Sequence, residues 1–180
     1  MMKIFFTADC HFGHGKIILY THRPYKNVNH MDEELIRRWN KTVSGNDLVY
    51  HVGDFAFKNS GQKFEQRLNG SIVHIAGNHD RNNQVKTLIT SADMEFGNKL
   101  FLVRHHPPVE PEDISDVYDG ILCGHVHDHW KVNIYRGCIP IINVGTDVWD
   151  FTPVSIASLL KFYDYIKNHA ECLDHATHKR

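Results

Sequence analysis

The chain of 180 residues is 42% hydrophobic and 23% charged, which is the balance of one soluble globular domain with a sizeable core. A formal net charge of −1 at pH 7 excludes a broad basic field for nonspecific nucleic-acid binding. The four cysteines have no CxxC spacing, and neither a signal peptide nor a membrane-length apolar run is present, so we expect a cytoplasmic protein with reduced thiols and no membrane contact.

Six short apolar runs are rich in β-branched and aromatic residues and are mostly bounded by turn-forming residues, which predicts strands. Their nearly continuous apolar character indicates sheets that are covered on both faces. In chain order the predicted strands are residues 3–8, 47–53, 71–77, 99–104, 120–124 and 140–145.

Helical patterns lie between these runs, and the two longer ones, residues 31–42 and 156–167, have apolar residues on one face. The last helix is the clearest, because Ser155 can cap its N-terminus. The predicted helices are residues 31–42, 61–68, 84–89 and 156–167.

Strands that alternate with helices predict an α/β domain. We expect a single domain over residues 1–168 and a polar C-terminal tail over residues 169–180. The loop over residues 11–29 is long for a compact domain, and long ordered loops are often functional.

Side chains of the kinds that bind metals follow five of the predicted strands. Because the carboxyl ends of strands in α/β sheets are where sites are built, these side chains are candidates for one site. The fifteen histidines of the chain fit this interpretation, since histidine is the commonest metal ligand. The five motifs are Asp9-Cys10-His11, Gly53-Asp54, Gly77-Asn78-His79-Asp80, His105-His106-Pro107 and Gly124-His125-Val126-His127.

The spacing within the motifs supports metal binding. Asp9 and His11 are two residues apart, as are His125 and His127, and in extended backbone such pairs point the same way, so each pair can reach one ion. A glycine precedes three of the motif ligands, where it permits close backbone approach. The donors are imidazole, carboxylate and amide groups, which suit Mn, Fe, Co, Ni or Zn.

Together the five motifs resemble those of the calcineurin-like metallophosphoesterase family, over residues 9–127. The stretches "HFGHGKII" and "NVGTDVWDFTPVS" are similar to a small prokaryotic and phage branch of that family. The resemblance implies a two-sheet β-sandwich flanked by helices, in four layers. It also implies two divalent metal ions on one edge, with Mn first and Ni, Fe, Co or Zn as alternatives.

The same resemblance implies a role for each motif residue. Asp54 would bridge the two metals, and His79 would face the phosphate instead of binding a metal. Of the two adjacent histidines, His105 carries the His-x-Pro spacing and would be the ligand, so His106 would point away. The first metal would be held by Asp9, His11 and His127, and the second by Asn78, His105 and His125.

Residues beside the motifs are candidates for the remaining chemistry. Asp80 is expected to orient the His79 ring, as carboxylates do for catalytic imidazoles. His14 and Arg23 are the predicted substrate ligands, because imidazoles and cations bind phosphate. Weaker candidates of the same kind are Lys16 and Arg81, whereas Cys10, His51 and His74 are predicted to be structural.

These residues predict a dinuclear-metal-dependent phosphoesterase in which a metal-bridging hydroxide attacks phosphorus. A phosphodiesterase acting on a phosphorylated small molecule or a nucleotide is favoured, because a chain of this size leaves little room for a cap over the site. Two alternatives stay open: a nuclease acting on nucleic-acid ends, and a non-catalytic scaffold of the same fold that binds proteins. The nuclease is not favoured, since no basic stripe is interleaved with exposed aromatic residues.

Overall fold

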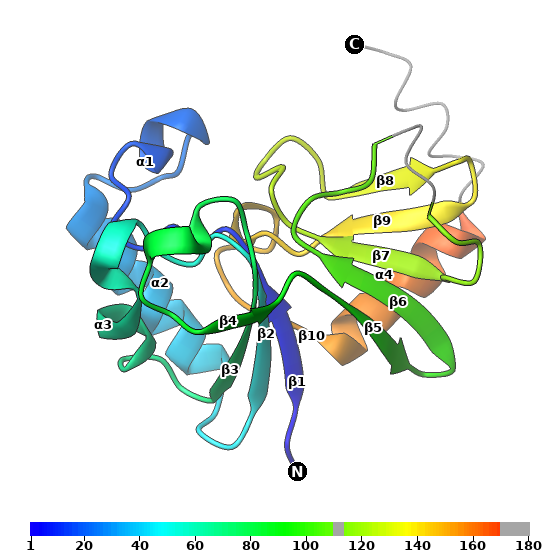
Figure 1. Ribbon diagram of the computed structural model, residues 1–180, viewed down its shortest axis with the longest axis horizontal. Coiled ribbons are helices and arrows are strands. Elements are labelled where there is room, and N and C mark those ends of the chain that lie inside the picture. The colour runs from blue at the N-terminus through cyan, green and yellow to red at the C-terminus, as the bar shows by residue number, and fades with distance from the viewer. Residues whose placement is uncertain (110–113, 170–180) are drawn as a thin grey trace.

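The computed structural model describes residues 1–109 and 114–169. Within these residues the chain forms two five-stranded sheets that lie next to each other, with helices on their flanks (Figure 1). This arrangement confirms the predicted two-sheet α/β architecture. Of the predicted tail, residues 170–180 lie outside the described part of the chain.

The first sheet has the strand order β10-β1-β2-β3-β4. Its neighbours β1 to β4 pair in parallel, and β10 runs antiparallel to β1 at the edge. Its strands are β1 (Ile4–Thr7), β2 (Leu48–Val52), β3 (Ser71–Ile75), β4 (Thr87–Ile89) and β10 (Val154–Ser155).

The second sheet has the strand order β5-β6-β7-β9-β8. Its three inner strands are parallel, and both edge strands are antiparallel to their neighbours. Its strands are β5 (Ser91–Phe96), β6 (Lys99–Arg104), β7 (Gly120–Cys123), β8 (Val132–Tyr135) and β9 (Ile139–Asn143).

The two longer helices begin at side-chain caps. Asn27 Oδ1 accepts a hydrogen bond from His30 N at 2.9 Å, and Ser155 Oγ accepts one from Ser158 N at 3.1 Å, as predicted for the last helix. Among the described residues, no helix is both long and apolar enough to cross a bilayer. The helices are α1 (Ile17–Tyr20), α2 (Val28–Thr42), α3 (Gly61–Glu65) and α4 (Ile156–Asn168).

Buried apolar side chains form separate layers around the first sheet. One cluster packs α2 and α3 against that sheet and includes Trp39 and Phe64. A second cluster joins the two sheets and includes Phe6 and Leu122, with Leu159 of α4 packed into it. The first sheet is therefore covered on both faces, as its continuous apolar runs predict.

Sequence patterns failed at the edges of the sheets. The predicted helix at residues 84–89 is wrong, because its end forms β4 as the outermost strand of the first sheet. Strands β5, β8 and β10 were not predicted. Along β5 exposed and half-buried residues alternate, so this edge strand lacks the continuous apolar run that marks the inner strands.

The carboxyl ends of the parallel strands of both sheets meet at one edge of the sandwich, and the loops that follow them are tied together. Asp9 N donates to Gly53 O and His11 N donates to Asp54 O, both at 3.0 Å. In the second sheet, Gly124 N donates to His105 O at 3.0 Å. Between the two sheets, His125 N donates to Asp9 Oδ2 at 2.9 Å, so these hydrogen bonds together bring the predicted motifs into one place.

Candidate metal centre

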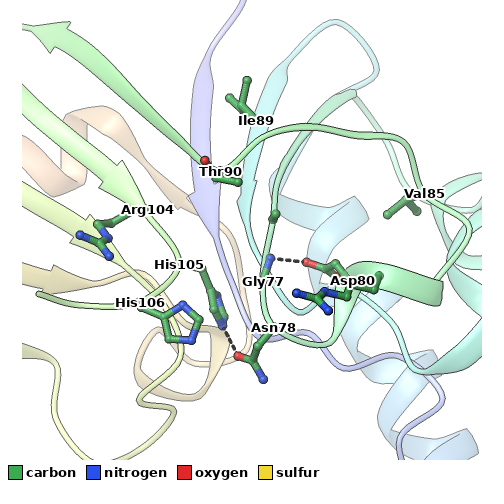
Figure 2. Close-up of a pocket in the computed structure, with 11 residues that line it drawn as sticks. Gly77, Asn78, Asp80, Val85, Ile89, Thr90, Arg104, His105 and His106 are labelled. Atoms are coloured by element: carbon green, nitrogen blue, oxygen red, sulfur yellow. Dashed lines mark hydrogen bonds between the residues drawn. The ribbon is translucent and has the colours of Figure 1, made fainter.

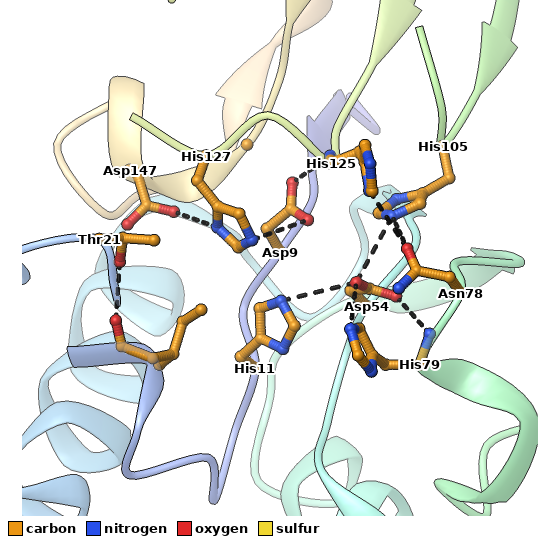
Figure 3. A network of polar contacts seen from close by, with 12 residues as sticks. Asp9, His11, Thr21, Asp54, Asn78, His79, His105, His125, His127 and Asp147 are labelled. Atoms are coloured by element: carbon orange, nitrogen blue, oxygen red, sulfur yellow. Dashed lines mark hydrogen bonds and ion pairs between the residues drawn. The ribbon is translucent and has the colours of Figure 1, made fainter. Parts of the chain in front are cut away.

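The first group of ligand atoms comes from Asp9, His11 and His127, which can each offer one atom within 4.8 Å of the others (Figure 3). Asp9 Oδ1 and His11 Nε2 are buried, and neither has a hydrogen-bond partner within the described part of the chain. Leaving a buried polar atom unpaired costs about 1–3 kcal/mol, so two such atoms at one point fit a bound cation.

The second group comes from Asn78, His105 and His125. His105 Nε2 and His125 Nδ1 each lie 3.2 Å from Asn78 Oδ1. Atoms that bind one ion at about 2.0–2.2 Å lie roughly 3–3.5 Å apart, so each of the two imidazole nitrogens already has the spacing of a ligand relative to the amide oxygen. His105 Nδ1 lies 2.8 Å from Val52 O, a carbonyl that fixes the proton on Nδ1 and leaves Nε2 free for an ion.

The Asp54 carboxylate lies between the two groups. Its Oδ2 is 3.6 Å from His11 Nε2 and 3.5 Å from His105 Nε2, while its Oδ1 accepts a hydrogen bond from His79 N at 2.9 Å. Burial raises the pKa of Asp54, but hydrogen bonding to His105 and His79 outweighs it, and the pKa lies below its ordinary value. The carboxylate is therefore ionised at neutral pH.

The charges at this edge favour a cation. Burial raises the pKa of Asp9 to about 6. Burial also lowers the pKa of His105, yet the hydrogen bond to Asp54 and the charge of Asp9 more than compensate and bring it to about 9. A site whose negative charge holds a proton this firmly on an imidazole also attracts a metal ion, which competes with that proton.

Much of the site is built from unusual backbone. Among the described residues, five of the seven predicted ligands have positive φ, a conformation that costs about 1–3 kcal/mol in most residues. The expected extended backbone is therefore wrong at both pairs. Asp9 and His11 still lie in one group of ligand atoms, as expected, whereas the second pair is divided between the two groups. The five residues are Asp9 (57°), His11 (50°), Asp54 (59°), His125 (73°) and His127 (48°).

Two glycines allow the close approach that the site needs. A Cβ at Gly53 would meet the His105 ring, and a Cβ at Gly77 would meet the Asp54 carboxylate and its backbone N. Gly53 also has φ of +91°, which favours glycine. The predicted role of glycine before the ligands therefore holds at both positions.

Asp80 has a different role from the predicted one. None of its hydrogen bonds reaches the His79 side chain, so the expectation that Asp80 orients this ring is wrong. The carboxylate instead connects the loop that follows β2 with the loop that follows β3. It accepts hydrogen bonds from the backbone N–H groups of Asp54 (2.8 Å), Phe55 (3.0 Å) and Gly77 (2.7 Å) and from Asn83 Nδ2.

Arg23 also departs from its prediction as a substrate ligand. It is 4% exposed, and its guanidinium donates to both carboxylate oxygens of Asp147 at 2.7 and 2.8 Å and to the carbonyls of Asp9 and Cys10. Its donors are occupied inside the protein. Asp147 in turn lies 3.2 Å from His127 Nδ1, which turns Nε2 of that ring toward Asp9.

Asp147 is a site residue that the sequence interpretation missed. It follows the parallel strand β9, so the rule that identified the other motifs also applies to it. A carboxylate that holds the second nitrogen of a ligand histidine is a common support of metal sites. Asp147 and Arg23 therefore form a buried support beneath the first group of ligand atoms.

The remaining candidates divide between the site and the rest of the molecule. The His14 ring lies 5.4 Å from the His11 ring and stacks on Phe57 at 4.4 Å, so it lies at the site. Lys16 and Arg81 are both exposed, and Arg81 also lines the cavity beside the second group of ligand atoms. The three residues predicted to be structural are buried: Cys10 (2% exposed), His51 (0%) and His74 (5%).

His106 does not point away from the site as expected. Its ring centroid is 4.3 Å from that of His125 and 4.9 Å from that of His105. Figure 2 shows the His106 ring beside His105, near Asn78. These three residues help to line a cavity of about 770 Å³ that opens beside the second group.

A comparison with protein families identifies the chain. The model of the calcineurin-like phosphoesterase superfamily domain matches residues 2–159. The chain belongs to this family. The resemblance seen in the five motifs is thereby confirmed, and the calcineurin-like phosphoesterase domain takes up nearly the whole chain.

Relatives of this calcineurin-like phosphoesterase chain occur in archaea and phages. An uncharacterized protein of Methanocaldococcus jannaschii is 34% identical over 172 residues, which cover 91% of this chain and 93% of that protein. The gene 66 protein of Mycobacterium phage D29 is 24% identical over 190 residues, covering 86% and 93%. A solved protein of unknown function from Aquifex aeolicus has the same fold, with a TM-score of 0.69 at 23% identity over 90% of this chain and 100% of that one.

Proposed function

We propose that this protein is a phosphoesterase that uses two divalent metal ions and acts on phosphodiesters. The position of Asp54 carries the proposal, because its Oδ2 lies 3.6 Å from His11 Nε2 and 3.5 Å from His105 Nε2. One carboxylate oxygen between two groups of ligand atoms can serve two ions. A pair of ions is a recurring arrangement in enzymes that hydrolyse phosphate esters.

The donors fit such ions. Asp54 would be shared, and imidazole, carboxylate and amide donors suit Mn, Ni, Fe, Co or Zn. When bound, the two ions lower the pKa of water and neutralise charge on the phosphate oxygens. The first ion would be held by Asp9, His11 and His127, and the second by Asn78, His105 and His125.

His79 would face the phosphate. Its side chain is 52% exposed, and its Nε2 lies 4.0 Å from Asp54 Oδ2, at the mouth of the site. From there Nε2–H can donate to a phosphate oxygen or to the leaving alkoxide, a role typically worth about 10²–10⁴-fold in rate. His14 lies on the same side as His11 and would supply a second contact to the phosphate.

The shape of the site supports diesters. The cavity of about 770 Å³ begins at Asn78 and His105 and continues to Arg81 and the apolar side chains of Val85 and Ile89. It can hold an ester arm next to the scissile phosphate, since small-molecule sites have volumes of about 300–1,000 Å³. The substrate would be a phosphorylated small molecule or a nucleotide.

The test uses metal-stripped protein that is reloaded with Mn, Ni, Co, Zn or Mg. Each sample is offered bis-p-nitrophenyl phosphate and p-nitrophenyl phosphate. We expect metal-dependent hydrolysis of the diester, faster than that of the monoester. Hydrolysis of the monoester alone would make the protein a phosphatase, and two bound ions without hydrolysis of either ester would favour a binding scaffold.

Two variants separate metal binding from proton transfer. His79→Ala should lower kcat by about 10²–10⁴-fold while both ions stay bound. Asp54→Asn should reduce the number of tightly bound ions to one or none and abolish turnover. Two tightly bound ions in Asp54→Asn would contradict the bridge, and loss of an ion in His79→Ala would contradict the role of His79. His129→Ala, which changes an exposed histidine, is the matched control.

A further inference from the structure

We propose that His106 is a ligand of the second metal ion and biases that position toward Zn-type ions over Mn. The inference rests on the metal pair of the proposed function and assigns a further ligand to it. His105, His106 and His125 can each offer one ring nitrogen within 4.8 Å of the other two. Three imidazoles gathered in this way can bind one ion when their rings close in until each nitrogen lies about 2.0–2.1 Å from it.

The local backbone explains why the consecutive residues His105 and His106 both face the second group of ligand atoms. Strand β6 ends at Arg104, and the chain bends at His105 and His106 before Pro107. In a strand, consecutive side chains point to opposite faces, but a bend removes that alternation. The His106 ring consequently packs against the His125 ring instead of turning to the far face of the sheet.

His106 is available for an ion. Among the described residues, neither of its ring nitrogens has a hydrogen-bond partner, and the residue is exposed on the wall of the cavity. A histidine that serves only in packing does not require a ring nitrogen close to the nitrogens of two other candidate ligands, as His106 has. The ring contacts with His105 and His125 therefore extend the second group of ligand atoms.

The two metal positions then differ in chemistry. The first has two imidazoles, from His11 and His127, and two carboxylates. The second has three imidazoles, one amide from Asn78 and the shared carboxylate of Asp54. Imidazole suits Zn, Cu, Fe and Ni, whereas oxygen donors suit Mg, Ca and Mn, so the second position prefers the softer group of ions.

The test measures metal binding directly, without turnover. Metal-stripped wild type, His106→Phe and His129→Phe are titrated with Zn²⁺ against a chromophoric chelator, and metal content is measured after loading with equimolar Zn²⁺ and Mn²⁺. Phenylalanine keeps a ring against His125 and removes both nitrogens. His129 is an exposed histidine and gives the matched control.

We expect two Zn²⁺ ions on the wild type, and a second ion bound about 100-fold more weakly by His106→Phe, as loss of support for a metal typically costs 10–100-fold. The Zn-to-Mn ratio at equimolar loading should fall in His106→Phe, and both quantities should be unchanged in His129→Phe. The unfolding curves of the three metal-free proteins should coincide, which excludes a folding defect.

The outcomes separate this inference from the proposed function. Two Zn²⁺ ions bound with equal affinity by wild type and His106→Phe would overturn the role of His106 and leave the proposed function intact. Failure of the wild type to bind metal would overturn both. Weaker binding of both metals to the same degree, with an unchanged Zn-to-Mn ratio, would also refute the selectivity.

Discussion

Replacing Arg23 with methionine tests whether this residue supports the site from within. The Asp147 side chain is 2% exposed, and in Arg23→Met its carboxylate would lose two hydrogen bonds, of 2.7 and 2.8 Å. With Arg23 and His127 as partners, the pKa of Asp147 is about 2 despite its burial. Removing one partner of a buried ion pair costs about 3–5 kcal/mol, because the other charge is left unpaired.

The assay is urea unfolding of the metal-free protein at pH 7, followed by tryptophan fluorescence. We expect Arg23→Met to lose about 3–5 kcal/mol of unfolding free energy, and Arg23→Met combined with Asp147→Asn to lose less, since no charge is then stranded. Arg37→Met, which changes an exposed arginine of α2, should stay within about 0.5 kcal/mol of the wild type. A loss below about 1 kcal/mol in Arg23→Met, with a raised KM for diesters, would refute the buried support and restore Arg23 as a substrate ligand.

Three further predictions follow from contacts near the site. Gly77→Ala should destabilise the fold by at least about 1–3 kcal/mol in urea unfolding, because its Cβ would meet Asp54; a stable variant with two ions bound would contradict this. Burial raises the pKa of Asp32 from 3.8 to about 6. The stability that protonated Asp32 contributes is therefore fully present below about pH 3.8 and is lost as the pH rises through 6. Asp32→Asn should therefore be more stable than wild type at pH 8, by at most about 3 kcal/mol, with a flatter pH profile between 4 and 7; equal slopes would exclude Asp32 as the cause. Saturating metal at about 100 times its Kd should add about 2.7 kcal/mol per ion to the unfolding free energy, measurable as a higher Tm, and a chelator should reverse it.

The inner strands and most candidate ligands could be predicted because one physical rule covers both. Buried parallel strands have continuous apolar sequences, and polar residues directly after them lie at a common edge. Asp54 and Asn78 were identified in this way. The edge strand β5 could not be, because half of its residues face solvent and its pattern resembles that of a loop.

Errors within the site arose where contacts join distant parts of the chain. Arg23 and Asp147 are separated by 124 positions, and nothing near Arg23 in the sequence indicates that a carboxylate occupies its donors. Asp80 lies beside His79 in sequence, yet the geometry of the turn directs its carboxylate to backbone N–H groups. His106 was predicted to point away from the site because side chains alternate along a strand. Strand β6 ends at Arg104, and the chain bends at His105 and His106, so this alternation no longer holds there.

The left-handed backbone at five candidate ligands restricts which side chains this edge accepts. Apart from glycine, the residues that most readily adopt positive φ are asparagine, aspartate and histidine. The same three types supply the amide, carboxylate and imidazole donors of metal sites. A library of random substitutions at Asp9, His11, Asp54, His125 and His127 should therefore be enriched in potential ligands by selection for folding alone, before any metal or substrate is offered.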